Sequence, residues 1–76
     1  MDYTELTEEE QAAILAERKK RYEEQYFIDV TSKAEYEYIL LTEPAGEYRD
    51  RIQSYLDGCN ARIHECQRAL EAIAQG

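Results

Sequence analysis

A chain of 76 residues is expected to form a single domain over 1–76 with a thin core, because a chain of this length buries only about 60% of its unfolded surface. Seventeen acidic residues against nine basic ones give a net charge of −8, which argues against direct binding to nucleic acid and to anionic membranes, since both require a basic face. The charge favours another protein with a basic surface as the partner, although solubility alone would also account for it.

The two cysteines are too few for a secreted disulfide scaffold. The N-terminus is acidic, where a secretory signal would be basic, and no apolar run approaches the roughly 20 residues that span a bilayer. The sequence therefore predicts a cytoplasmic protein.

Residues 8–26 are predicted to form the first helix. Thr7 followed three positions later by Glu10 is a capping box, in which each side chain bonds the backbone N–H of the other residue. No Gly or Pro interrupts this segment. Its apolar face is weak and consists of Ala12, Leu15, Tyr22 and Tyr26.

Residues 32–42 form a short middle element that can be interpreted in two ways. Ser32 and Glu35 make a second capping box, which favours a separate short helix. The alternation of Glu and Tyr over 35–39 is instead typical of a strand, and pairing with 26–30 would make a β-hairpin between two helices. The favoured fold is all-α, with α+β as the alternative.

Residues 47–74 are predicted to form a long amphipathic helix, after a break at Pro44 and Gly46. Seven apolar residues follow one another in this helix at alternating steps of four and three, the heptad pattern of a coiled coil. We call them the heptad seam: Ile52, Leu56, Cys59, Ile63, Cys66, Leu70 and Ile73.

The heptad seam is almost palindromic about Ile63, so an antiparallel homodimer would pair like with like. Packing of the seam within one chain, against the first helix and the middle element, is the equally weighted alternative. The first helix as predicted is only about 27 Å long and covers part of a helix of about 40 Å, so something else has to cover the remainder.

The sequence contains no group of residues spaced for catalysis or for metal binding, and no motif identifies a known family. Cys59, His64 and Cys66 do not converge on a helix as zinc ligands would, so we predict buried reduced thiols and no metal site. We expect no cofactor and no catalytic residue, because no shaped pocket is indicated that would shift a carboxyl pKa.

The remaining candidate is an acidic, tyrosine-rich surface around the break. Carboxylates can engage Arg and Lys side chains, and Tyr rings supply contact area. The sequence thus predicts a non-enzymatic protein-binding module, an acidic inhibitor or adaptor that docks on a basic and nucleic-acid-binding protein surface. The alternative is an assembly subunit that oligomerises through the heptad seam. The predicted partner-binding residues are Glu35, Tyr36, Glu37, Tyr38, Glu43, Glu47 and Tyr48.

Overall fold

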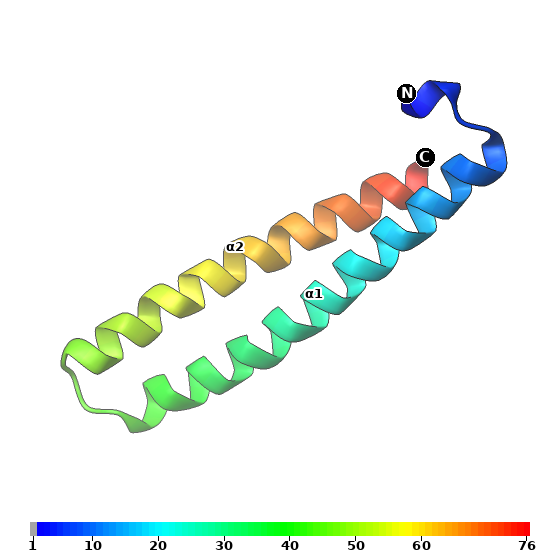
Figure 1. Ribbon diagram of the computed structural model, residues 1–76. Helices are drawn as coiled ribbons and strands as arrows, with labels where there is room; N and C mark the ends of the chain where they lie inside the picture. The colour runs from blue at the N-terminus through cyan, green and yellow to red at the C-terminus, as the bar shows by residue number, and fades with distance from the viewer. Residues whose placement is uncertain (1) are drawn as a thin grey trace.

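The computed structural model describes residues 2–76, which form an antiparallel helical hairpin (Figure 1). A short 3₁₀ turn, η1 (Tyr3–Glu5), precedes helix α1 (Glu8–Thr42), and a four-residue loop leads into helix α2 (Glu47–Gln75). The hairpin measures 56 × 18 × 16 Å. The all-α prediction is confirmed, and the α+β alternative is wrong, because no strand occurs among residues 2–76.

Helix α1 begins at the capping box that the sequence predicts. The backbone N–H of Glu10 donates to Thr7 Oγ1 over 3.1 Å, and the backbone N–H of Thr7 donates to Glu10 Oε1 over 3.0 Å. The hydrogen bond from the Thr7 backbone stabilises the carboxylate and lowers the pKa of Glu10. Three successive glutamates in this first turn add to the stability of the helix, because their negative charges lie at the positive end of the helix dipole.

The predicted division into a helix over 8–26 and a middle element over 32–42 is wrong, because α1 runs unbroken through both. The β-branched residues between them lower helix propensity by only about 0.5 kcal/mol each. Thr31 satisfies its hydroxyl inside the helix by donating to the carbonyl of Phe27 over 2.9 Å. Ser32 is helical rather than a cap, so the second capping box does not form. Packing against α2 outweighs the local signal.

The helix break falls where Pro44 and Gly46 predict it. The Thr42 hydroxyl donates to the Tyr38 carbonyl over 3.2 Å, and the Glu43 N–H donates to the Ile39 carbonyl in the last helical hydrogen bond. Glu43 itself has an extended backbone, which ends α1 directly before Pro44. Helix α2 then spans Glu47–Gln75, one residue longer than the predicted 47–74.

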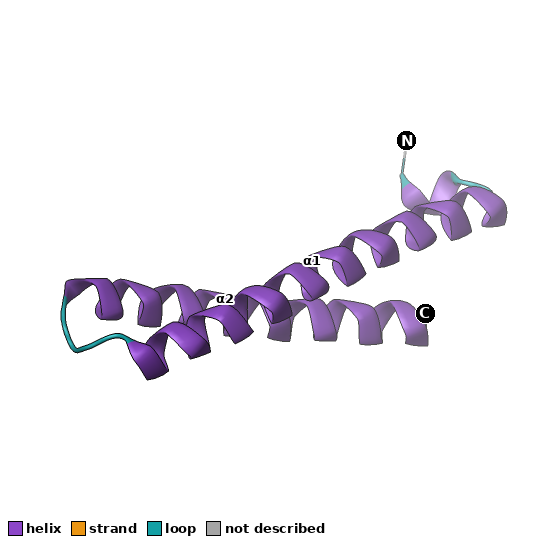
Figure 2. Cartoon of the chain, turned by 90° about the horizontal axis from the view of Figure 1, so that it is seen from below, coloured by secondary structure: helices purple, strands orange, loops and turns teal. Residues whose placement is uncertain are grey.

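The core lies between the two helices and is built on the heptad seam of α2. Ile52, Leu56, Cys59 and Cys66 are buried, and the other three members of the seam are partly buried. Seen from below, the helices cross at a shallow angle and separate toward the chain ends (Figure 2). The face that α1 turns toward the core contains half-buried side chains: Leu15, Tyr22, Tyr26, Tyr36, Ile39 and Leu40.

Helix α1 has 35 residues against 29 in α2, so it is about 9 Å longer at a rise of 1.5 Å per residue. The first turns of α1 extend past the end of α2 and carry η1 with them (Figure 1). Gln11 holds η1 in place, because its Nε2 donates to the carbonyls of Tyr3 over 2.9 Å and Leu6 over 3.3 Å.

Candidate protein-binding surface

The acidic residues lie almost entirely on the surface of the hairpin. Of the 17 acidic side chains only Asp29 is buried, and the others are exposed. Residues 2–17 carry six acids and no base, so the end of α1 that extends past α2 is strongly negative. A second acidic region surrounds the loop, and the basic run 18–21 lies between the two regions.

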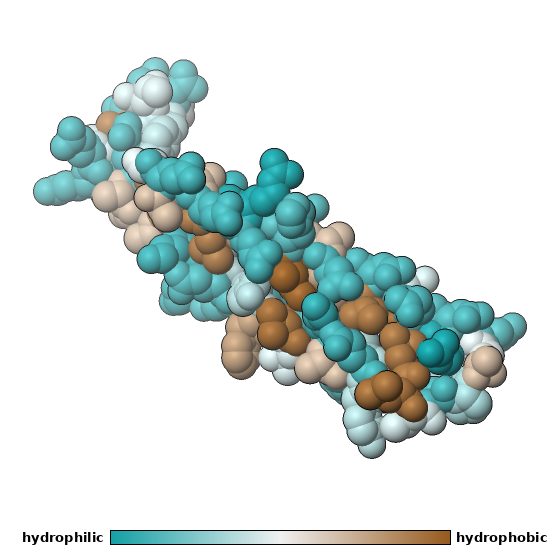
Figure 3. Space-filling model, turned by 180° about the vertical axis from the view of Figure 1, so that it is seen from behind, coloured by the Kyte–Doolittle hydropathy of each residue, from teal (hydrophilic) through white to brown (hydrophobic). Residues whose placement is uncertain are grey.

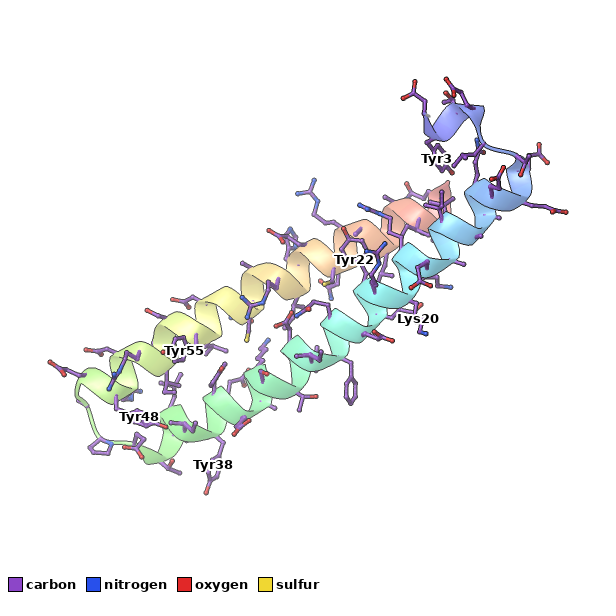
Figure 4. All side chains as sticks on the ribbon, viewed as in Figure 1. Tyr3, Lys20, Tyr22, Tyr38, Tyr48 and Tyr55 are labelled. Atoms are coloured by element: carbon purple, nitrogen blue, oxygen red, sulfur yellow. The ribbon has the colours of Figure 1, made fainter. Side chains whose placement is uncertain are left out.

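The residues of the predicted acidic, tyrosine-rich surface do not all lie on one side of the hairpin. Six of them are exposed at the loop end of the hairpin: Glu35, Glu37, Tyr38, Glu43, Glu47 and Tyr48. Tyr36 instead turns toward α2, where its ring centroid lies 5.9 Å from that of Tyr55. Figure 4 shows Tyr38 pointing away from α2, whereas Tyr55, although 52% exposed, lies on the side of α2 that faces α1. Successive residues of a helix point about 100° apart, so residues 35–38 cannot form one face.

The heptad seam packs within the chain, against α1. Because α1 is about 52 Å long rather than the 27 Å expected for 8–26, it runs alongside the whole length of α2, which is about 43 Å long. The seam is most deeply buried at Ile52, Leu56, Cys59 and Cys66 and only partly buried toward the C-terminus. An antiparallel homodimer through the same seam would require α1 to be displaced from it.

An ion pair between a buried carboxylate and a half-exposed guanidinium joins the two helices near their middle, and sequence reasoning missed it. The Asp29 side chain is 3% exposed, and its Oδ1 accepts a hydrogen bond from Arg62 Nε over 3.0 Å. Gln25 Nε2 donates to the other oxygen of Asp29 over 2.9 Å. The Asp29 carboxylate raises the pKa of the Arg62 guanidinium, first by this hydrogen bond and then by its charge.

The signal for the ion pair is present in the sequence. Asp29 continues a series with a seven-residue step that runs from Leu15 through Tyr22 to Tyr36, so it belongs to the buried stripe of α1. A charge in such a stripe requires a partner on the facing helix. Arg62 immediately precedes Ile63 of the heptad seam, which places it at the border of the interface.

Both cysteines are free buried thiols, as predicted. Burial raises the pKa of the Cys66 thiol, and the negative charges of Asp29 and Glu65 raise it further. Arg62 Nη2 donates to Cys59 Sγ over 3.6 Å. His64 is exposed, and no group of three metal-ligating side chains comes together within residues 2–76.

We expect both thiols to react slowly in the folded chain. A thiol-specific disulfide reagent at about pH 8 should modify them about 100-fold or more slowly than it modifies the chain in urea, because both thiols are buried between the helices and out of reach of the reagent. The reaction can be followed by the absorbance of the released thiolate. Equal rates in buffer and in urea would contradict the burial of the heptad seam.

A small basic hollow lies on α1 between the two acidic regions. It is lined by Arg18, Arg21, Tyr22 and Gln25. The Arg18 guanidinium lies over the Tyr22 ring, 5.0 Å from the ring centroid. This contact gives the basic run a packing role on the helix surface.

The chain is an acidic two-helix hairpin. No helix among residues 2–76 has the length and apolar character of a membrane span. A search of protein-family models, of curated proteins and of solved structures found no match to this chain.

Proposed function

We propose that this chain is a non-enzymatic protein-binding module, an acidic inhibitor or adaptor that docks on a basic protein surface of the kind that binds nucleic acid. The observation that supports this function is that all but one of its 17 acidic side chains are exposed on a rigid two-helix scaffold. Carboxylates held on rigid helices present charge to Arg and Lys side chains at little cost in entropy.

The negative charge per unit length of this hairpin is much lower than that of a nucleic acid, so electrostatic attraction alone gives only part of the binding energy. A net charge of −8 over a length of 56 Å corresponds to about one charge per 7 Å, whereas duplex DNA carries one per roughly 1.7 Å. Carboxylates alone therefore compete weakly with a nucleic acid for a basic groove. Apolar contact has to contribute to the affinity, and exposed side chains such as Tyr38 and Tyr48 supply it.

The test is capture on the immobilised chain from a nuclease-treated lysate of its native organism, with elution by a salt gradient. A captured protein should be a nucleic-acid-binding one, and its affinity should fall roughly tenfold between about 50 and 200 mM salt. Its own nucleic acid should displace it.

Two variants test which acidic region binds the partner. One replaces Glu8, Glu9 and Glu10 by Gln, and the other replaces Glu35 and Glu37 by Gln. Both variants keep side-chain size and remove charge from one acidic region each. At least one of them should elute its partner at lower salt. Binding that ignores salt, nucleic acid and both variants would refute the proposal.

We further propose that the protein acts in the reducing environment of the cytoplasm. Both thiols lie free in the core, and neither is positioned for a disulfide with the other, since seven positions on a helix separate them by about 10.5 Å.

A further inference from the structure

A second heptad pattern lies on the side of α1 that faces away from α2. We call it the outer stripe: Phe27, Thr31, Ala34, Tyr38 and Leu41, at steps of four, three, four and three. At about 100° per residue these side chains fall within one sector of α1, opposite to that of Asp29 and Tyr36. All five are exposed, including Phe27 at 71%, Tyr38 at 65% and Leu41 at 86%.

The outer stripe makes no contribution to the packing of α1 on α2. α2 packs on the other side of α1, and Figure 4 shows Tyr38 directed away from it. On the face drawn in Figure 3, apolar side chains form an interrupted band along the hairpin. Single exposed apolar residues are ordinary, but a heptad row over four turns is the pattern of a helix that packs against another helix.

The residues that border the outer stripe indicate what packs on it. Glu23 and Glu37 flank one side of it, and Glu24 and Glu35 flank the other. Lys20 lies one heptad before Phe27, in a hollow that it shares with Phe27, Glu23 and Glu24. All four of these glutamates are exposed.

Two of the flanking glutamates form exposed ion pairs with bases of α1, since Lys19 Nζ lies 3.8 Å from Glu23 Oε1 and Lys33 Nζ lies 3.9 Å from Glu37 Oε1. Glu24 and Glu35 form no ion pair within residues 2–76. In helix pairs the charges at these flanking positions decide which partner is accepted.

A second copy of this chain is a poor occupant. Two outer stripes packed together would bring the flanking glutamates of one copy close to those of the other, and like charges in such positions are destabilising. The net charge of −8 adds repulsion over the whole surface.

We propose that the outer stripe is the docking face for an amphipathic helix of the partner, one whose apolar stripe is flanked by Lys or Arg. This inference rests on the proposed function and assigns it a face. The stripe is about 21 Å long at 1.5 Å per residue, which matches four to five turns of a partner helix. Phe27 and Leu41 are the apolar anchors at its two ends, and Ala34 at its centre allows close approach.

Three synthetic peptides of equal length, each with a fluorescent label, test the proposal against the full chain. The first is a helical peptide with Leu at the core heptad positions and Lys at the flanking ones. The second has Glu in place of Lys, and the third has the Lys–Leu composition in a scrambled order without a heptad. Fluorescence anisotropy should show binding of the first peptide about tenfold or more tighter than of the third, and no binding of the second.

Single substitutions in the chain test the face itself. Phe27→Gln and Leu41→Gln should each weaken binding of the heptad Lys peptide about tenfold or more. The matched control is Ile14→Gln, which removes an apolar side chain that is 44% exposed on α1 outside the stripe and should leave binding unchanged. Circular dichroism should give the same helical content for all three variants, because none of the side chains is buried.

Three other results would contradict the docking face, the proposed function or the choice of a basic partner. Equal binding of the heptad and scrambled Lys peptides, unaffected by Phe27→Gln, would remove the docking face and leave the proposed function standing. No binding of either Lys peptide at about 50 mM salt would remove both. A dimer of the chain alone in sedimentation equilibrium, dissociated by Leu41→Gln, would make a second copy the occupant and overturn the basic partner.

Discussion

Replacement of Leu56 by Ala should lower the free energy of unfolding by about 3 kcal/mol. Leu56 is 8% exposed and lies in the heptad seam between Ile52 and Cys59, so its loss leaves a cavity at the interface of the two helices. A chain of 76 residues is expected to have a total stability of only about 4–11 kcal/mol, and this one substitution removes a large part of it. Urea unfolding followed by circular dichroism measures the change.

The matched control is Leu41→Ala, which removes the same atoms from a side chain that is 86% exposed. It should change the free energy of unfolding by no more than about 0.5 kcal/mol. Equal losses for the two leucines would mean that Leu41 is also buried, and that the arrangement of the two helices described above is wrong.

The second large effect concerns the ion pair of Asp29 with Arg62, where the two partners should respond in opposite directions. Asp29→Leu keeps the number and branching of the side-chain heavy atoms and replaces a buried carboxylate by an apolar group. We expect it to raise the free energy of unfolding by about 1–3 kcal/mol, because the desolvation cost of the carboxylate disappears. Arg62, whose side chain is 51% exposed, can then turn to water.

Arg62→Ala should instead destabilise the hairpin, since it leaves the Asp29 carboxylate buried without its cation. Urea unfolding of both variants at neutral pH tests the pair. The double variant Asp29→Leu with Arg62→Ala should be about as stable as Asp29→Leu alone, because Arg62 has no buried charge left to neutralise. Destabilisation by Asp29→Leu would show that the ion pair contributes net stability in this interface.

The heptad seam is the part of the fold that the sequence predicts well. A run of seven apolar residues at steps of four and three defines a helical face without reference to the rest of the chain, and the structure buries that face. The break at Pro44 is equally local, because a proline and a nearby glycine disfavour a helix in any context.

The continuity of α1 could not be predicted, because its cause is not local. The segment around Ile28 and Val30 and the capping box at Ser32 both indicate an interruption when they are read alone. What keeps them helical is the packing of Asp29 and Tyr36 on a helix more than 15 residues further along the chain. Helix propensities of a few tenths of a kcal/mol are small beside such contacts.

The candidate surface was predicted only in part, for a related reason. The acidic, tyrosine-rich run at 35–48 lies around the loop, but which of its rings is free depends on where α2 packs. Tyr36 and Tyr38 look alike in the sequence and lie on opposite sides of α1 in the hairpin. The outer stripe was missed because its heptad becomes visible only once residues 27–41 are known to be helical.

The short loop between the helices gives folding a direction. The contact between Tyr36 and Tyr55 closes a segment of about 20 residues, whereas the ion pair of Asp29 with Arg62 joins residues 33 apart in sequence, and contacts at the open end join residues still further apart. The entropy cost of closing a loop rises with its length, so the hairpin is expected to form first at the loop and to close progressively toward the chain ends. The outer stripe lies on the loop-end half of α1, and it therefore belongs to the part of the molecule that orders earliest and opens last.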